Sequence, residues 1–154
     1  MSKGKNESSR LREGVPNTRH NPFPVASGFE SIYSHGVEAP PASRLLFISG
    51  QIGVTQAGVT LEGFRAQFEQ AIANLSAVLT HAQMSDADLV KLTFFVTRAS
   101  DLRELGEIRH RLLAAGTAVT TLVVVALARP DLLVEVEGFA ASAIAVGRQK
   151  TADD

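Results

Sequence analysis

The segment from Thr120 to Val146, TTLVVVALARPDLLVEVEGFAASAIAV, constrains the fold more than any other part of the chain. Its first run, residues 122–128, is apolar at every position, which predicts a strand buried on both faces. Pro130 lacks a backbone donor and has a fixed φ, so that strand should end before it. We therefore predict two strands, 120–128 and 133–143, joined as a hairpin by a turn at residues 129–131.

The second of these strands interrupts its apolar pattern with two carboxylates, Glu135 and Glu137. Side chains alternate along a strand, so both point to one face, roughly 6.5–7 Å apart. A carboxylate on a largely apolar strand either pairs with another group, such as Lys91 across the sheet, or takes part in chemistry. The sequence leaves both explanations open, for Glu137 as well as for Glu135.

Length and composition indicate one soluble domain. The chain has 154 residues, 45% hydrophobic and 20% charged, and a net charge of −1, which gives no overall reason to expect nucleic acid or an anionic membrane as partner. It contains no cysteine, which excludes disulfides, thiolate metal sites and a cysteine nucleophile. No apolar run approaches the ~20 residues of a membrane helix, and residues 1–20 lack the apolar core of a secretory signal. We predict a cytoplasmic protein.

Hydrophobic periodicity divides the chain into an N-terminal arm or tail (1–28), one domain (29–146) and a C-terminal tail (147–154). Within the domain we predict strands at 29–37, 44–49 and 89–97 before the final pair, and amphipathic helices at 61–83 and 102–115. Gly50 and Gly53 are expected to turn the chain at the end of the second strand. The order β-β-α-β-α-β-β predicts a two-layer α/β domain with two helices on one face of a mixed sheet.

Several predicted strands are apolar on both faces, although two helices can cover only one. Leu45 and Phe47 alternate with Leu46 and Ile48, and the strand after residue 120 shows the same pattern. Such a face would be a large exposed patch on a monomer. We therefore expect an oligomer in which other subunits cover it.

Four stretches resemble the RidA/YjgF family of reactive-intermediate deaminases: IYSHGV (32–37), LFISGQI (46–52), VKLTFFVT (90–97) and LARPDLLVEVEGFA (127–140). The resemblance runs from about Phe29 to Ala143. It implies a chorismate-mutase-like fold and a homotrimer with small-molecule clefts between subunits. It also implies hydrolysis of enamines or imines to a keto acid and ammonia, without a metal or an organic cofactor.

Four positions match residues that the family places in its pocket: Tyr33, Ser49, Gly50 and Glu135. In the family, the glutamate positions the hydrolytic water. The resemblance and the residue types together suggest that Tyr33 and His35 supply an acid or base near neutral pH, and that Ser49 polarises the substrate. For each residue a purely structural role stays open.

Other positions depart from the family pattern. Deaminase-type members carry a carboxylate-binding arginine fifteen residues before the glutamate, where this chain has Thr120, followed by Thr121. A family asparagine falls near Gly106, and a glutamine is replaced by His35. A short hydroxyl cannot replace a guanidinium, so Thr120 and Thr121 are either ordinary strand residues or hydroxyls lining an altered pocket.

The remaining polar residues indicate no second site. The other histidines show no metal-ligand spacing. The basic residues of the second predicted helix, Arg103, Arg109, His110 and Arg111, are interrupted by glutamates and indicate a solvated face rather than an RNA surface. We therefore predict an atypical RidA-type hydrolase with Glu135, Tyr33 and His35 as catalytic residues. The alternative is a non-catalytic trimeric binding or regulatory protein, and a weaker one is a ribonuclease.

Overall fold

A computed structural model describes residues 16–22, 25, 32–113 and 116–143. Four strands form the main sheet: β3 (Ser43–Ile52), β4 (Leu89–Val96), β5 (Ala118–Val123) and β6 (Val134–Ala143). Two helices accompany it, α1 (Phe64–His81) and α2 (Leu102–Leu112), and single turns of 3₁₀ helix precede β4 and α2. Two short strands, β1 (Thr18–His20) and β2 (Gly36–Glu38), form a separate antiparallel ribbon.

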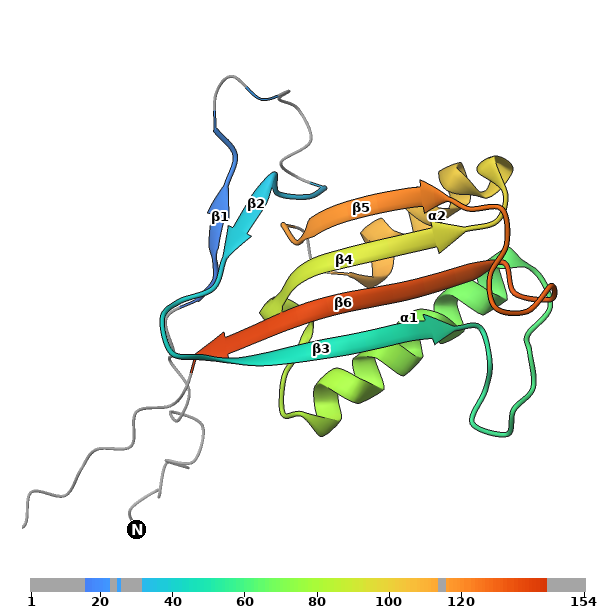
Figure 1. The fold of residues 1–154 in the computed structure, drawn as a ribbon, viewed down its shortest axis with the longest axis horizontal. Coiled ribbons are helices and arrows are strands. Elements are labelled where there is room, and N and C mark those ends of the chain that lie inside the picture. The colour runs from blue at the N-terminus through green and yellow to red at the C-terminus, as the bar shows by residue number, and fades with distance from the viewer. Residues whose placement is uncertain (1–15, 23–24, 26–31, 114–115, 144–154) are drawn as a thin grey trace, which may run out of the picture.

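The main sheet has the strand order β3-β6-β4-β5. Strands β4 and β5 are parallel, whereas β6 is antiparallel to both of its neighbours, so the sheet is mixed. Both helices lie on one face of it (Figure 1). The predicted two-layer α/β architecture is confirmed.

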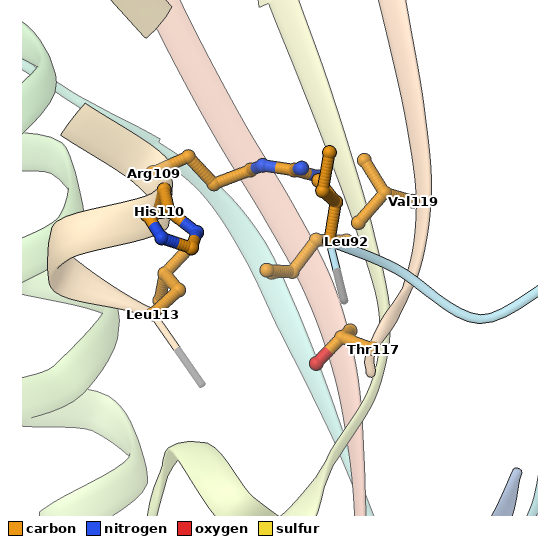
Figure 2. Close-up of a pocket in the computed structure, with 7 residues that line it drawn as sticks. Leu92, Arg109, His110, Leu113, Thr117 and Val119 are labelled. Carbon is orange, nitrogen blue, oxygen red and sulfur yellow. The ribbon is translucent and has the colours of Figure 1, made fainter. Parts of the chain in front are cut away.

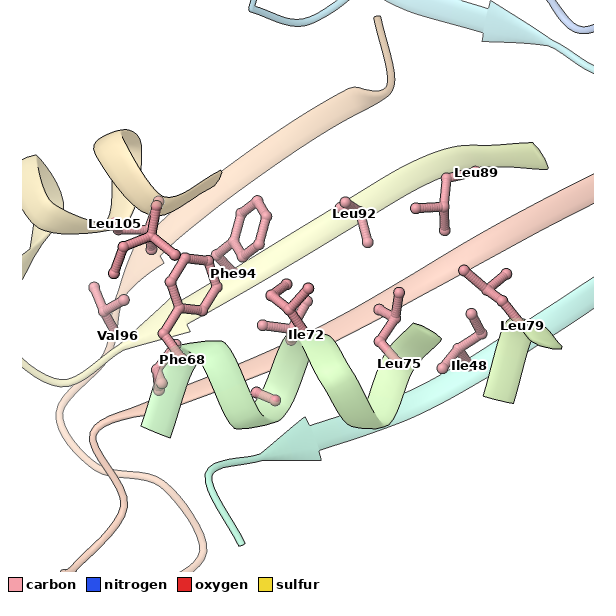
Figure 3. Packing of buried hydrophobic residues seen from close by; sticks show 14 of the residues in the cluster. Ile48, Phe68, Ile72, Leu75, Leu79, Leu89, Leu92, Phe94, Val96 and Leu105 are labelled. Carbon is pink, nitrogen blue, oxygen red and sulfur yellow. The ribbon is translucent and has the colours of Figure 1, made fainter. Parts of the chain in front are cut away.

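The core fills the space between the sheet and the helices (Figure 3). The stripe on α1 that contacts the sheet recurs at helical spacing, with Phe68, Ile72, Leu75 and Leu79 all at most 4% exposed. Phe68 packs edge-to-face on Phe94 of β4, with ring centroids 5.6 Å apart. Each such side chain contributes about 1.5–3 kcal/mol by burial, so the stripe holds α1 on the sheet. None of the helices in the described ranges is long and apolar enough to span a membrane.

Helix boundaries differ slightly from the sequence prediction. Helix α1 begins at Phe64 rather than at residue 61, because Gly63 has φ of 82° and is not helical. Helix α2 ends at Leu112, and the following Leu113 is extended. The predicted helical residues 114 and 115 lie outside the described residues.

The predicted hairpin between the last two strands is wrong, because β4 lies between β5 and β6. Strand β5 ends at Val123, well before residue 128. The Val124 amide still donates to the Val96 carbonyl at 2.8 Å, but β4 stops there and leaves no partner for the residues that follow. Residues 124–133 therefore connect β5 to β6 beyond the end of β4. The predicted turn at residues 129–131 is present within this connection, where the Leu132 amide donates to the Arg129 carbonyl at 3.2 Å.

Two further strand predictions need correction. The strand expected at 29–37 is reduced to β2 and an isolated bridge between Ser34 and Ala118, and residues 29–31 lie outside the described residues. Part of the predicted N-terminal arm forms β1, which pairs with β2. Strand β3 continues to Ile52, so Gly50 sits at a register irregularity within the strand rather than at a terminal turn.

The face of the sheet opposite the helices is open in the single chain. Phe47 and Phe139 stand edge-to-face on neighbouring strands, with centroids 5.2 Å apart, and are 71% and 40% exposed. Leu45 and Leu122 are also exposed large apolar residues. We refer to this surface of β3, β6, β4 and β5 as the open face. It is the uncovered apolar surface that the sequence pattern predicts.

Candidate functional site

The predicted site residues separate into two groups, and the first lies on the open face. Glu135 of β6 pairs in register with Ile52 of β3 and is half-buried. Its side chain lies directly against Gly50: a Cβ built on that glycine would be 2.6 Å from the carboxyl carbon and 2.9 Å from Cγ of Glu135. Any larger residue at position 50 would require the Glu135 carboxylate to move from this position. The structure thus brings together two residues predicted for the same site.

The same face carries a cation next to the predicted Thr120. The Lys91 ammonium of β4 donates a hydrogen bond to the Thr120 hydroxyl of β5. Burial lowers the pKa of Lys91 below its ordinary value, and the charge of Glu137 raises it in part. No ion pair joins Lys91 to Glu135 among the described residues. Lys91, the partner that the sequence suggested for the two carboxylates, therefore interacts with Glu137 rather than with Glu135.

The second group of predicted residues surrounds a hollow of about 380 Å³ between α2 and the edge strand β5. Seven residues line it: Ile32, Tyr33, Leu105, Gly106, Arg109, Val119 and Thr121. Tyr33 also stands edge-to-face against His35, with ring centroids 5.5 Å apart, as expected for two residues on one face of an extended segment. The volume is at the lower end of the range for small-molecule sites, about 300–1,000 Å³.

Thr120 and Thr121 contribute to different groups, because adjacent strand residues face opposite sides. Thr120 meets Lys91 on the open face, whereas Thr121 lines the hollow on the helix side. Ser49 is exposed on β3, one residue before Gly50. One chain therefore does not bring Glu135 and Tyr33 into a single pocket. A common site needs a second copy.

Arg109 of α2 is the hollow residue that the sequence analysis missed. Its side chain extends from the helix toward Val119 of β5, above a small cavity of about 10 Å³ that Leu92, His110 and Thr117 also line (Figure 2). Burial lowers the pKa of the Arg109 guanidinium, and the nearby Tyr33 oxygen partly raises it. The side chain remains a cation. The missed signal was its spacing of three residues from Gly106, which puts both on one face of α2.

Other polar groups have structural partners. The Arg129 guanidinium donates to the Asp131 carboxylate at 3.0 Å and to the Thr60 hydroxyl, close to the chain that enters β6. The described residues contain no group of three or more His, Asp or Glu side chains that could hold a metal ion.

Comparison with known proteins identifies the family of this chain. The family model described as "Endoribonuclease L-PSP" matches residues 26–142. A RutC family protein of Aquifex aeolicus is 39% identical over 77 residues, which cover 49% of this chain and 59% of that protein.

Two solved structures share the fold. A Rid family protein of unknown function from Yersinia pestis, YyfB, is 30% identical with a TM-score of 0.73, covering 82% of this chain and 98% of its own. TdcF of E. coli, solved with bound serine, is 26% identical with a TM-score of 0.60, covering 77% and 91%. The chain therefore belongs to the RidA/YjgF family, whose sequence model carries the name Endoribonuclease L-PSP.

Proposed function

We propose that this protein is a cytoplasmic RidA-type hydrolase that acts on an imine, an enamine or a related small substrate in a cleft between subunits of a homotrimer. The observation that carries the proposal is the contact between Glu135 and Gly50, which holds a carboxylate on a mostly apolar face at a position matching the family glutamate. A carboxylate on a mostly apolar face, packed against a residue without a side chain, is in a position that suits a catalytic group.

In the proposed reaction, Glu135 orients a water molecule and accepts a proton from it as the oxygen attacks the carbon of a C=N bond. The C–O bond forms while the C=N π electrons move to nitrogen, which takes up a proton. Collapse of the resulting carbinolamine expels ammonia and leaves a carbonyl compound. Tyr33 and His35, in ring contact with each other, supply and accept protons near the nitrogen. No cofactor takes part in these steps.

The open face and the division of the site support an oligomer, and the family resemblance suggests that this oligomer is a trimer. Phe47 and Phe139 present apolar surface that a monomer would leave in water. Packing of neighbouring subunits over this face would bury them. It would also bring the Glu135 group of one subunit toward the hollow beside Tyr33 of another. TdcF with bound serine provides an example of a relative that holds a ligand of amino-acid size.

The test compares the parent protein with Glu135→Gln on a panel of imines and enamines generated in situ, with ammonia release as the measurement. Glu62→Gln, at an exposed glutamate before α1, serves as the matched control. We expect Glu135→Gln to lose at least about 100-fold in rate, with the control unchanged. Equal turnover by the parent and Glu135→Gln would exclude the proposed role of this carboxylate.

A second candidate function is a trimeric binding or regulatory protein without catalysis. It is favoured by Thr120, which stands where RidA-type deaminases carry their substrate-binding arginine and which is already bonded to Lys91. This function predicts saturable binding of a small ligand with no turnover on any substrate of the panel. Ribonuclease activity, which the family name suggests, would require RNA binding that weakens steeply with salt.

A further inference from the structure

Arg109, the cation that lines the hollow between α2 and β5, has no carboxylate partner among the described residues. The neighbouring arginines of α2 do have partners: Arg103 lies 3.5 Å from Glu107, and Arg111 lies 2.6 Å from Glu69 on α1. Arg109 instead turns inward between α2 and β5. A half-buried guanidinium has lost part of its hydration, so its charge is stabilised when an anion is bound.

We infer that Arg109 is the anion anchor of this protein and binds the carboxylate of a small substrate in the hollow between α2 and β5. The inference deepens the proposed function, because it assigns a substrate class and a binding residue to that site. It also places the anchor on a different element from the family arginine, on α2 rather than on β5.

The surroundings of Arg109 favour a small organic carboxylate. The guanidinium offers planar paired donors that match the two carboxylate oxygens. Tyr33 and Thr121 line the same hollow and add hydroxyl groups, whereas Ile32, Leu105 and Val119 give it apolar walls for the body of a ligand. Inorganic phosphate would satisfy the guanidinium but would leave these walls without an apolar partner.

Gly106 keeps the space beside the guanidinium free. It stands three residues before Arg109 on α2 and lines the same hollow. A Cβ built at Gly106 meets no heavy atom within 4 Å, so the helix surface is open at this point. The family asparagine expected near this position would project into this space. Its replacement by glycine is consistent with a site in which the polar contact comes from Arg109.

The experiment measures equilibrium binding by titration calorimetry, using the full chain and two matched probes, 2-oxobutanoate and its uncharged amide. The variants are Arg109→Gln, which removes the charge, and Arg109→Lys, which keeps it without the paired donors. Arg103→Gln is the control, because that side chain is 90% exposed on the same helix. Inorganic phosphate is titrated as a third ligand.

We expect the parent protein to bind 2-oxobutanoate more tightly than the amide and than phosphate. Arg109→Gln should weaken 2-oxobutanoate binding by about 10- to 100-fold and leave the amide unchanged. Arg109→Lys should give an intermediate value, and Arg103→Gln should match the parent. Arg109→Lys carries the comparison on its own if Arg109→Gln does not fold, as judged by circular dichroism.

The inference is overturned if Arg109→Gln binds 2-oxobutanoate as tightly as the parent, or if phosphate binds more tightly than 2-oxobutanoate. These outcomes are separate from failure of the proposed function. Loss of carboxylate binding in Arg109→Gln with no turnover by the parent would support the anchor and exclude the hydrolase. Turnover that depends on Glu135 but not on Arg109 would support the hydrolase and exclude Arg109 as the anchor.

Discussion

Substitution of Gly50 by alanine tests the contact on which the proposed catalytic role of Glu135 depends. The new methyl carbon would lie 2.6 Å from the Glu135 carboxyl carbon, which must retreat to at least 3.4 Å for ordinary contact. One carboxylate oxygen lies closer still to the new methyl carbon, so the carboxylate must move by more than about 1 Å. A misplacement of about 1 Å can cost about 100-fold in rate. Overpacking of this kind also destabilises by about 1–3 kcal/mol. Ammonia release and chemical denaturation measure the two effects.

A double-mutant cycle separates this contact from a general effect on β3. Glu135→Ala removes the obstacle, so Gly50→Ala in that background should be nearly neutral for stability, which gives a coupling energy of about 1–3 kcal/mol. Gly36→Ala is a control on another strand, because its new Cβ would stand 3.6 Å from the nearest atom, at ordinary contact distance. The reasoning is refuted if Gly50→Ala unfolds at the parent's denaturant midpoint and retains full activity.

Three other substitutions test the assembly, the core and the hollow. Phe47→Asp puts a charge at a 71% exposed position of the open face and should lower the particle mass in light scattering from three chains to one. The control Val59→Asp, at an exposed position away from the sheet, should leave the mass unchanged. Gln67→Leu removes a buried amide that donates to the Asp131 carbonyl at 2.8 Å, so urea unfolding should show a loss of about 1–3 kcal/mol. A gain there would contradict the importance of this bond. Gly106→Ala has free space for its methyl group and should stabilise α2 by about 0.5–1 kcal/mol in thermal unfolding; a loss would mean that the hollow is filled.

The sequence predicted those parts of the fold that depend on local periodicity. The apolar stripe of α1 recurs at 3.6-residue spacing and could be assigned to a buried face from the sequence alone. Pairing of β5 with β4 instead of β6 could not be assigned in this way, because apolar runs show that a strand is buried but not which strand lies beside it. The family resemblance located Glu135, Gly50 and Tyr33 in the sequence. It did not show that one chain leaves them in two separate groups.

Arg109 was missed for a related reason. In the sequence it stands among charged residues that alternate in sign, a pattern typical of a solvated helix face. Arg103 and Arg111 do form ion pairs with glutamates, as that pattern indicates. Only the position of β5 relative to α2 shows that the Arg109 side chain points inward. This position depends on contacts between residues far apart in the chain.

The neighbours of Thr120 are adapted to a hydroxyl at this position. The Lys91 ammonium donates to it and interacts with the Glu137 charge. A guanidinium at position 120 would stand beside the Lys91 ammonium on the adjacent strand, and the two cations would share the Glu137 carboxylate. A half-buried cation without a partner of its own is unfavourable. On the other side of β5, Arg109 has space and no competing cation in the hollow. The proposed binding of a substrate carboxylate by Arg109 would therefore put the positive charge on the opposite face of the edge strand from Thr120.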